Sequence, residues 1–277
     1  MGIGEILHYD FVQRAILAGI LIGAICSLLG VFLVLRRFSL IGDGLAHVTF
    51  GSVAVVLLLG ISPFYVTLAA LPIVMISSLV ILKLANTKRI QGDAAIGIVS
   101  SIGIAAGIIL ASLSGGYNLD LLSYLFGNIL TVNQTELLLA FIVFIVVAAT
   151  IIFFYNDLFA LTFDEDLAKT MGIKTSKISI ILFMLTAVAA VLAMRVAGIM
   201  LVSAMLILPP LTALQLSISF RMTIIASLIF SILSVISGII ISFLLNLPAG
   251  GTIVIINAVF LLLVFGVKKI TILQRYR

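Results

Sequence analysis

The sequence has 277 residues, of which 64% are apolar and 9% are charged, with a formal net charge of +5. Soluble domains contain about 45–50% apolar and about 25% charged residues, so this chain carries too little charge to cover the surface of a soluble globule. The composition excludes a soluble enzyme, a nucleic-acid-binding domain and a disordered chain, and it predicts an all-α, polytopic transmembrane helical bundle. The single cysteine, Cys26, excludes a disulfide framework and is expected to be a packed apolar residue.

Apolar runs account for most of the chain. A helix needs about 20 apolar residues to cross a bilayer, and the runs near that length are 13–35, 41–59, 64–84, 94–113, 135–155, 178–194, 198–217, 222–245 and 251–267. These runs predict nine spans, or eight if one of them is re-entrant. The first run ends in Arg36 and Arg37 rather than in a small-residue cleavage site, so we interpret it as a retained span. Residues 1–277 are expected to form a single transmembrane domain.

Basic residues are distributed unevenly between the two sides of the nine-span arrangement. Arg14 and Arg195 fall on one side, and the other 13 of the 15 fall on the opposite side: Arg36, Arg37, Lys83, Lys88, Arg89, Lys169, Lys174, Lys177, Arg221, Lys268, Lys269, Arg275 and Arg277. Because Lys and Arg accumulate in cytoplasmic loops, this asymmetry predicts an outside N-terminus and a cytoplasmic C-terminus. The outer connection Ser114–Gln134 is too short to span the membrane twice and is expected to be a half-helix or a re-entrant piece.

Asp43 and His47 are two ionisable residues inside the second apolar run. Ionisable groups at membrane depth are costly, so each is a functional candidate. A spacing of four places both side chains on one face of a helix. His47 lies ten residues after Arg37, and if this stretch is helical the separation corresponds to about 15 Å. That distance is near the middle of a hydrocarbon core about 30 Å thick.

A carboxylate and a neutral imidazole form a partial ligand set for a divalent transition metal such as zinc or manganese. Two ligands do not fill a tetrahedral shell, so a second copy of the chain, other polar groups or water would complete it. Incomplete ligation suits a carrier, which must release its ion. The alternative is an Asp–His hydrogen bond that locks helix packing. The small residues around the pair favour close helix packing: Gly42, Gly44, Ala46, Gly51, Ser52 and Ala54.

Pro209 and Pro210 lie inside the seventh apolar run. Two consecutive prolines remove two backbone donors and are expected to break or kink the helix at this point. Broken helices at membrane depth occur where they line a cavity, so the pair is a candidate helix break.

Residues 157–176 form the longest connection on the predicted inner side. Asp164 can cap a helix start, Glu165 and Asp166 suit the positive end of that helix, and Gly172 suits a left-handed C-terminal stop. Apolar residues recur along this segment at a spacing of four: Phe163, Leu167 and Met171. The segment is therefore expected to be a short amphipathic helix, which either lies on the inner face of the protein itself or docks against an ATPase subunit.

Three segments, in this order, resemble the permease subunits of zinc- and manganese-type ABC importers. They are Leu35–His47, Leu161–Gly172 and Ala197–Pro209, and Leu122–Gly127 is a weaker match. The similarity extends over essentially the whole chain. The sequence Asp-Gly-Leu-Ala-His-Val, which begins at Asp43, resembles the zinc branch of this family more than the manganese branch.

The resemblance implies a fold related to that of iron-siderophore and cobalamin permeases, with fewer spans. It implies a multi-pass protein of a prokaryotic cytoplasmic membrane, working as two permease copies with an ATP-binding ATPase subunit and an extracellular metal-binding lipoprotein. In this family Asp43 and His47 would lie on the metal pathway, and Asp164 to Gly172 would couple to the ATPase. No GxxxxGK[ST] motif occurs in this sequence. The chain is thus expected to be a transport subunit rather than an enzyme, with zinc or manganese as cargo and no permanently bound cofactor.

Three other functions compete with this interpretation. An intramembrane metalloprotease would need at least three firm ligands and a base, but the histidines are His8 and His47, and no HExxH motif occurs. A secondary carrier could use Asp43 as its proton site and would need no ATPase. An ABC permease for a metal chelate would need a wide polar cavity in place of a narrow site around His47.

Overall fold

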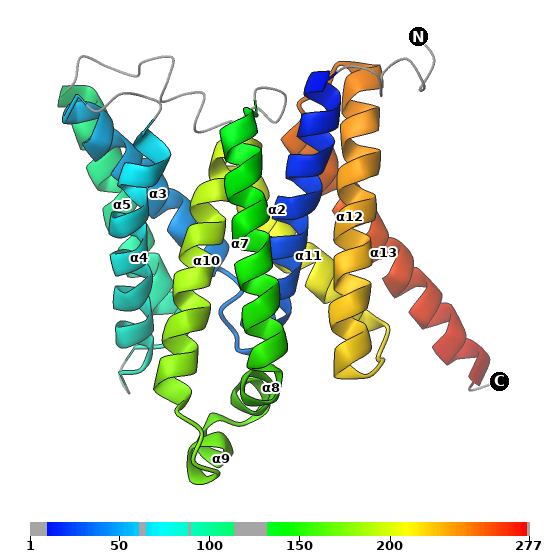
Figure 1. The fold of residues 1–277 in the computed structure, drawn as a ribbon. Coiled ribbons are helices and arrows are strands. Elements are labelled where there is room, and N and C mark those ends of the chain that lie inside the picture. The colour runs from blue at the N-terminus through cyan, green and yellow to red at the C-terminus, as the bar shows by residue number, and fades with distance from the viewer. Residues whose placement is uncertain (1–9, 61–64, 88–89, 114–131, 276–277) are drawn as a thin grey trace.

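The fold consists of helices in the part of the chain that the structure describes. The computed structural model describes residues 10–60, 65–87, 90–113 and 132–275 (Figure 1). Its helices are α2 (Asp10–Leu35), α3 (Ile41–Leu58), α4 (Val66–Ala85), α5 (Gly92–Leu113), α7 (Gln134–Phe153), α8 (Tyr155–Phe163), α9 (Glu165–Thr170), α10 (Thr175–Ala197), α11 (Ile199–Gln215), α12 (Phe220–Leu245) and α13 (Ala249–Arg275). No strand occurs within these ranges, which agrees with the predicted all-α class.

Each predicted apolar run corresponds to one helix of the described chain. Eight helices are long and apolar enough to cross a membrane, and α11 has a shorter apolar stretch, Leu201–Gln215. Successive crossings alternate in direction, so α2 begins and α13 ends at opposite ends of the bundle (Figure 1). The helices α8 and α9 lie at the end where α2 finishes. The chain is therefore a multi-pass membrane protein with eight long spans and one short one in its described part.

The helices divide into a buried centre and an exposed rim. In α2, 78% of the most apolar window is buried within the protein, against 17% in α7 and in α13. Cys26 lies in this centre and is fully buried, as expected for a packed apolar residue. On the rim, large side chains such as Ile255 and Leu262 of α13 are exposed. A rim this apolar is stable only when lipid covers it.

Helix α11 is continuous through Pro209 and Pro210, so the predicted break does not occur at this pair, whereas the predicted kink stays a prediction. The prolines remove the donors that would otherwise reach the carbonyl oxygens of Met205 and Leu206. The Leu206 carbonyl lies so close to α2 that a Cβ atom at Gly30 would overlap it. Close packing against Gly30 therefore supports the helix across the two missing bonds, an effect that sequence alone does not reveal.

Helices α3 and α5 meet along a seam of small residues. A Cβ atom at Gly51 would overlap the carbonyl oxygen of Gly103, and one at Gly103 would lie 2.8 Å from the Cα of Val48. Nearer the beginning of α3, a Cβ atom at Gly44 would lie 2.5 Å from a methyl carbon of Ile96. The small residues of α3 thus allow the close helix packing that the sequence predicts, and backbone contact fixes the position of α3.

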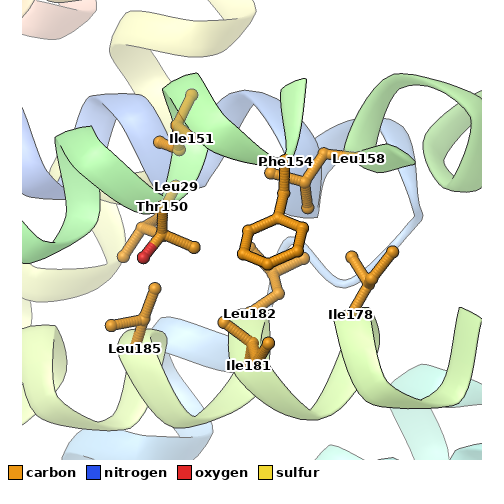
Figure 2. Close-up of a pocket in the computed structure, with 9 residues that line it drawn as sticks. All are labelled: Leu29, Thr150, Ile151, Phe154, Leu158, Ile178, Ile181, Leu182 and Leu185. Carbon is orange, nitrogen blue, oxygen red and sulfur yellow. The ribbon is translucent and has the colours of Figure 1, made fainter. Parts of the chain in front are cut away.

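A small apolar void of about 10 Å³ lies where α2, α7, α8 and α10 meet. Figure 2 shows its lining side chains, with the Phe154 ring among aliphatic groups: Leu29, Thr150, Ile151, Leu158, Ile178, Ile181, Leu182 and Leu185. The Thr150 hydroxyl donates to the carbonyl of Val146 at 2.8 Å. Because its polar group is already bonded and the space is so small, this void is a packing defect and not a ligand site.

Candidate functional site

A tight turn places the beginning of α3. The Phe38 N–H donates to the carbonyl of Leu33 at 2.9 Å, and the Ile41 N–H donates to the carbonyl of Phe38 at 3.1 Å. Helix α3 then begins at Ile41, so Asp43 lies in its first turn. A carboxylate in this position is stabilised by the positive end of the helix.

Asp43 and His47 lie on one face of α3, as their spacing predicts. The Nε2 atom of His47 is 3.6 Å from Oδ2 of Asp43, which is too long for a hydrogen bond. The His47 side chain is 26% exposed and the Asp43 side chain 52% exposed. The Nδ1 atom of His47 is buried and has no hydrogen-bond partner in the described structure. The two side chains thus lie within ion-pair distance without a hydrogen bond between them, and the Nδ1 atom of His47 keeps unused bonding capacity.

The depth of His47 in the membrane stays a prediction, but the helix that it assumed starts later. The value of about 15 Å took a helix from Arg37 onward, whereas the chain forms a turn from Arg36 to Leu40 and α3 starts at Ile41. His47 is the seventh residue of α3 and therefore lies about 9 Å along its axis from Ile41.

The Asp43–His47 pair is an incomplete ligand set within the described part of the chain. Among the described residues, no group of three or more His, Cys, Asp or Glu side chains is placed to hold a metal ion. Ser203 of α11, which sequence analysis did not single out, is a polar neighbour. Its hydroxyl is buried without a partner in the described residues, and a Cβ atom at Gly42 would lie 3.3 Å from its oxygen. Ser203 therefore faces α3 at Gly42, the residue before Asp43.

A cavity of about 310 Å³ lies farther along α3, between α3, α4 and α5. Its serines already use their hydroxyl groups: Ser52 donates to the Val48 carbonyl at 2.8 Å, and Ser77 donates to the Ile73 carbonyl at 2.9 Å. The rest of the lining is apolar or glycine. This cavity offers no ligand for a metal ion, so it is not the wide polar cavity that a chelate permease would need.

The predicted inner helix is present as two short helices, α8 and α9, which meet at Asp164. The Asp164 carboxylate accepts from the N–H groups of Asp166 at 3.1 Å and Leu167 at 2.9 Å, which confirms the predicted cap. Gly172 has a φ of 82°, as expected for a left-handed stop. Phe163, which was assigned to the same helix, ends α8 instead, because the extended backbone at Asp164 interrupts the helix.

Two apolar side chains at α9 point away from the rest of the described chain, although Ala168 of the same helix is fully buried. Leu167 of α9 is 58% exposed, and Met171, which follows its last residue, is 68% exposed. A helix that laid its apolar stripe on the inner face of its own protein would bury these two side chains. Their exposure therefore favours the other alternative, a surface that is free to meet a partner.

Ion pairs surround the beginning of α9, and sequence analysis missed the most buried of them. Nη2 of Arg36 donates to Oε2 of Glu165 at 3.2 Å, and Lys169 lies 3.1 Å from Glu165 and 3.2 Å from Asp166. Burial lowers the pKa of Arg36, an effect that the charge of Glu165 opposes. Hydrogen bonds with Glu165 and Asp166 raise the pKa of Lys169. Only the opposite charges of Arg36 and Glu165 were visible in the sequence, and nothing local joins residues so far apart.

Some predictions fall outside the described part of the chain. His8, the weaker family match at Leu122–Gly127 and most of the predicted re-entrant connection Ser114–Gln134 lie there. Arg195 belongs to the last turn of α10, and its side chain is also outside the described structure.

Known proteins resemble this chain along nearly its whole length. The sequence matches the ABC 3 transport family over residues 8–268. It is 34% identical to the manganese transport system membrane protein MntC of Halalkalibacterium halodurans, with 98% of this chain and 92% of that protein covered. It is 32% identical to the high-affinity zinc uptake system membrane protein ZnuB of Haemophilus influenzae, with 95% of this chain and 100% of that protein covered.

Solved structures show the same architecture. PsaBC from Streptococcus pneumoniae, solved in complex with Fab, superimposes with a TM-score of 0.83 at 32% identity and covers 95% of this chain and 94% of that chain. A metal-chelate type ABC transporter in an inward-facing conformation gives a TM-score of 0.74 at 18% identity, covering 94% of this chain and 85% of that chain. The second likeness concerns the fold alone.

Proposed function

The chain belongs to the ABC 3 transport family, and from that premise we propose that it is the membrane permease subunit of an ATP-driven importer for a divalent transition metal. The observation that carries the choice of cargo is the Asp43–His47 pair, a carboxylate and an imidazole on one helix face with unused bonding capacity. Relatives named for manganese and for zinc transport match almost the entire chain. Both metals accept this pair of donors.

In this mechanism the two side chains divide the work of holding the ion. Asp43 supplies a carboxylate, and His47 supplies a nitrogen donor that favours zinc or manganese over calcium or magnesium. Since the two groups are not bonded to each other, each can turn toward an ion without first breaking a hydrogen bond. Two donors leave room for water and for other protein groups, so the ion is bound weakly enough to leave again.

ATP hydrolysis is assigned to a separate subunit. The sequence has no GxxxxGK[ST] motif, so the energy must enter through contact with a partner. The exposed side chains of Leu167 and Met171 on α9 support this assignment, because a short capped helix with a free apolar stripe is suited to docking.

The orientation follows from the basic residues. Arg36 follows the end of α2, Lys83 lies in the last turn of α4, and Arg221 lies in the first turn of α12, all at the end of the bundle that carries α8 and α9. This distribution supports a cytoplasmic location for that end. We accordingly assign an outside N-terminus and a cytoplasmic C-terminus in a prokaryotic plasma membrane.

Two further partners complete the importer. A second permease copy is proposed because Asp43 is half exposed in the single chain and the pair lacks further described ligands. An extracellular metal-binding protein is proposed because an incomplete site of this kind cannot concentrate a scarce ion. The relatives named for high-affinity uptake and for import are consistent with such a system.

The experiment that tests the proposal is metal uptake into liposomes that contain the permease, its ATPase subunit and the external binding protein. We expect uptake of zinc and manganese only when ATP is present on the side of the ATPase. Zinc should be taken up faster than manganese, because the sequence from Asp43 resembles the zinc branch of the family. Faster manganese uptake would reverse the choice of metal. Uptake driven by a proton gradient without the ATPase would reject the proposal in favour of a secondary carrier.

A further inference from the structure

Glu165 lies at the beginning of α9 and binds a residue that is 129 positions away in the sequence. Its Oε2 accepts from Nη2 of Arg36 at 3.2 Å, while its Oε1 lies 3.1 Å from Nζ of Lys169. The Arg36 side chain is 6% exposed and the Glu165 side chain 37%. Because solvent screens a buried charge weakly, the bond to Arg36 resists separation more strongly than the exposed pairs of Lys169 do.

An aromatic ring lies beside the Arg36 guanidinium. The guanidinium carbon of Arg36 lies 5.7 Å from the centre of the Phe38 ring, which packs edge-on at 5.0 Å against Phe183 of α10. Its Nη1 atom is buried and has no hydrogen-bond partner in the described residues. Within that part of the chain, Glu165 is the carboxylate that neutralises this charge, so moving Glu165 away would leave Arg36 unpaired at a high cost.

Arg36 belongs to the turn that leads directly into α3. The bonds from Phe38 to Leu33 and from Ile41 to Phe38 close this turn. These bonds tie the turn to the end of α2 and to Ile41, the first residue of α3. Arg36 is thus joined to the start of α3 by a short hydrogen-bonded connection, and Asp43 lies only two residues beyond Ile41.

Helix α8 is fastened to the bundle by a different set of contacts. The Phe159 ring centre is 5.1 Å from that of Phe220 of α12, which in turn is 5.6 Å from Phe32 of α2. One extended residue, Asp164, with φ −153° and ψ 102°, separates α8 from α9. The contacts of α8 are thus separate from those of α9, and Glu165 is the first residue of α9 after the interruption.

We propose that the Arg36–Glu165 pair transmits movement of α9 to α3, which makes the two residues positioning residues of the transport cycle. The inference rests on the proposed function, in which an ATPase subunit docks on the apolar stripe of α9. When that subunit moves, Glu165 displaces Arg36 and the turn behind it. The Asp43–His47 pair then shifts relative to its neighbours, and its affinity for the ion changes.

The test measures ATP hydrolysis and zinc uptake in the same liposomes, with the complete complex. Glu165→Gln keeps the shape of the side chain and removes its charge. We expect ATP hydrolysis to continue while zinc uptake per ATP falls at least about fivefold, the lower range of coupling between sites. Arg37→Gln is the matched control, since Arg37 is exposed in the same turn and should keep the wild-type ratio.

A second variant guards against misfolding. Glu165→Gln leaves Arg36 unpaired, which could prevent a monodisperse complex from forming. In that case the double variant Arg36→Gln/Glu165→Gln removes both charges and should show the same low uptake per ATP. A wild-type ratio in either folded variant would overturn the inference. Loss of the ATPase from the purified Glu165→Gln complex would also overturn it, because the pair would then serve docking. Absence of ATP-dependent uptake in the wild type would instead reject the proposed function.

Discussion

The Asp43–His47 pair and the α9 segment are two polar regions of one apolar bundle, and they are built in opposite ways. In α9, Asp164 caps two backbone N–H groups, and Glu165 is paired on both of its oxygens. In α3, the two side chains stand 3.6 Å apart, and the Nδ1 atom of His47 has no described partner. A carboxylate paired on both oxygens, as Glu165 is, suits a part that transmits force. Unused bonding capacity suits a part that must accept and release a cargo.

The largest effect on metal uptake is expected at the Asp43–His47 pair. Asp43→Ala and His47→Ala, made singly, should each lower ATP-dependent zinc or manganese uptake at least about 100-fold. Mutation of a residue that only supports a metal ligand by a hydrogen bond lowers metal affinity or activity by about 10–100-fold. These two variants remove a ligand itself. The measurement is uptake into liposomes, with ATPase co-purification as the check on assembly.

Asp93→Asn is the matched control for these variants. Asp93 lies in the first turn of α5 and is exposed, as Asp43 is in α3, but a glycine occupies the position four residues later. Its loss should remove only a helix-end interaction of about 0.3–1 kcal/mol. Equal loss of uptake in Asp93→Asn would show that any acidic residue at this end matters, and the contrast between the two regions would be lost.

The second effect concerns the exposed stripe of α9. Leu167→Glu combined with Met171→Glu should reduce the amount of ATPase that purifies with the permease at least about tenfold, which corresponds to about 1.4 kcal/mol. Charges placed in an apolar contact must be desolvated. Lys169→Ala, on the same helix, should retain the ATPase. A double variant that still binds the ATPase normally would place the docking surface elsewhere.

The third effect tests whether backbone contact rather than polar bonding positions α3. Gly51→Ala would press a methyl group against the Gly103 carbonyl, and overpacking of this kind costs about 1–3 kcal/mol. Gly97→Ala meets nothing within 4 Å and should be neutral or stabilising by about 0.5–1 kcal/mol. Thermal unfolding in detergent measures both. Equal melting temperatures would mean that the α3–α5 seam is looser than the structure indicates.

The smallest effect is expected at the cap of α9. Asp164→Ala removes the acceptor of two N–H groups, which costs about 1 kcal/mol of the stability of α9, and should lower zinc uptake per ATP less than Glu165→Gln does. Asp164→Asn keeps an acceptor at the same place and should stay close to the wild type. If alanine and asparagine behave alike, the cap does not contribute to coupling.

Features that depend on local rules could be predicted from the sequence. The spans follow from apolar runs, the common face of Asp43 and His47 follows from their spacing, and the roles of Asp164 and Gly172 follow from helix-end chemistry. Each of these needs only a few neighbouring residues, and each is present in the structure.

Features that depend on tertiary contact could not be predicted. The helix continues through Pro209 and Pro210 because α2 packs against it at Gly30. Arg36 is buried because Glu165, far along the chain, meets it. The later start of α3 was missed because the turn before it cannot be distinguished from helix by composition. In each case the deciding partner lies outside the segment that was interpreted.

The most direct test of the account is the location of the metal in the assembled importer. We suggest a cryo-EM structure of the complete complex with a hydrolysis-deficient ATPase subunit, loaded with zinc. The account predicts an ion within about 2.0–2.2 Å of a His47 nitrogen and an Asp43 oxygen, with further ligands from water or from other groups. An ordered ion elsewhere in the pathway in every trapped state, with both side chains bound to protein groups instead, would contradict it.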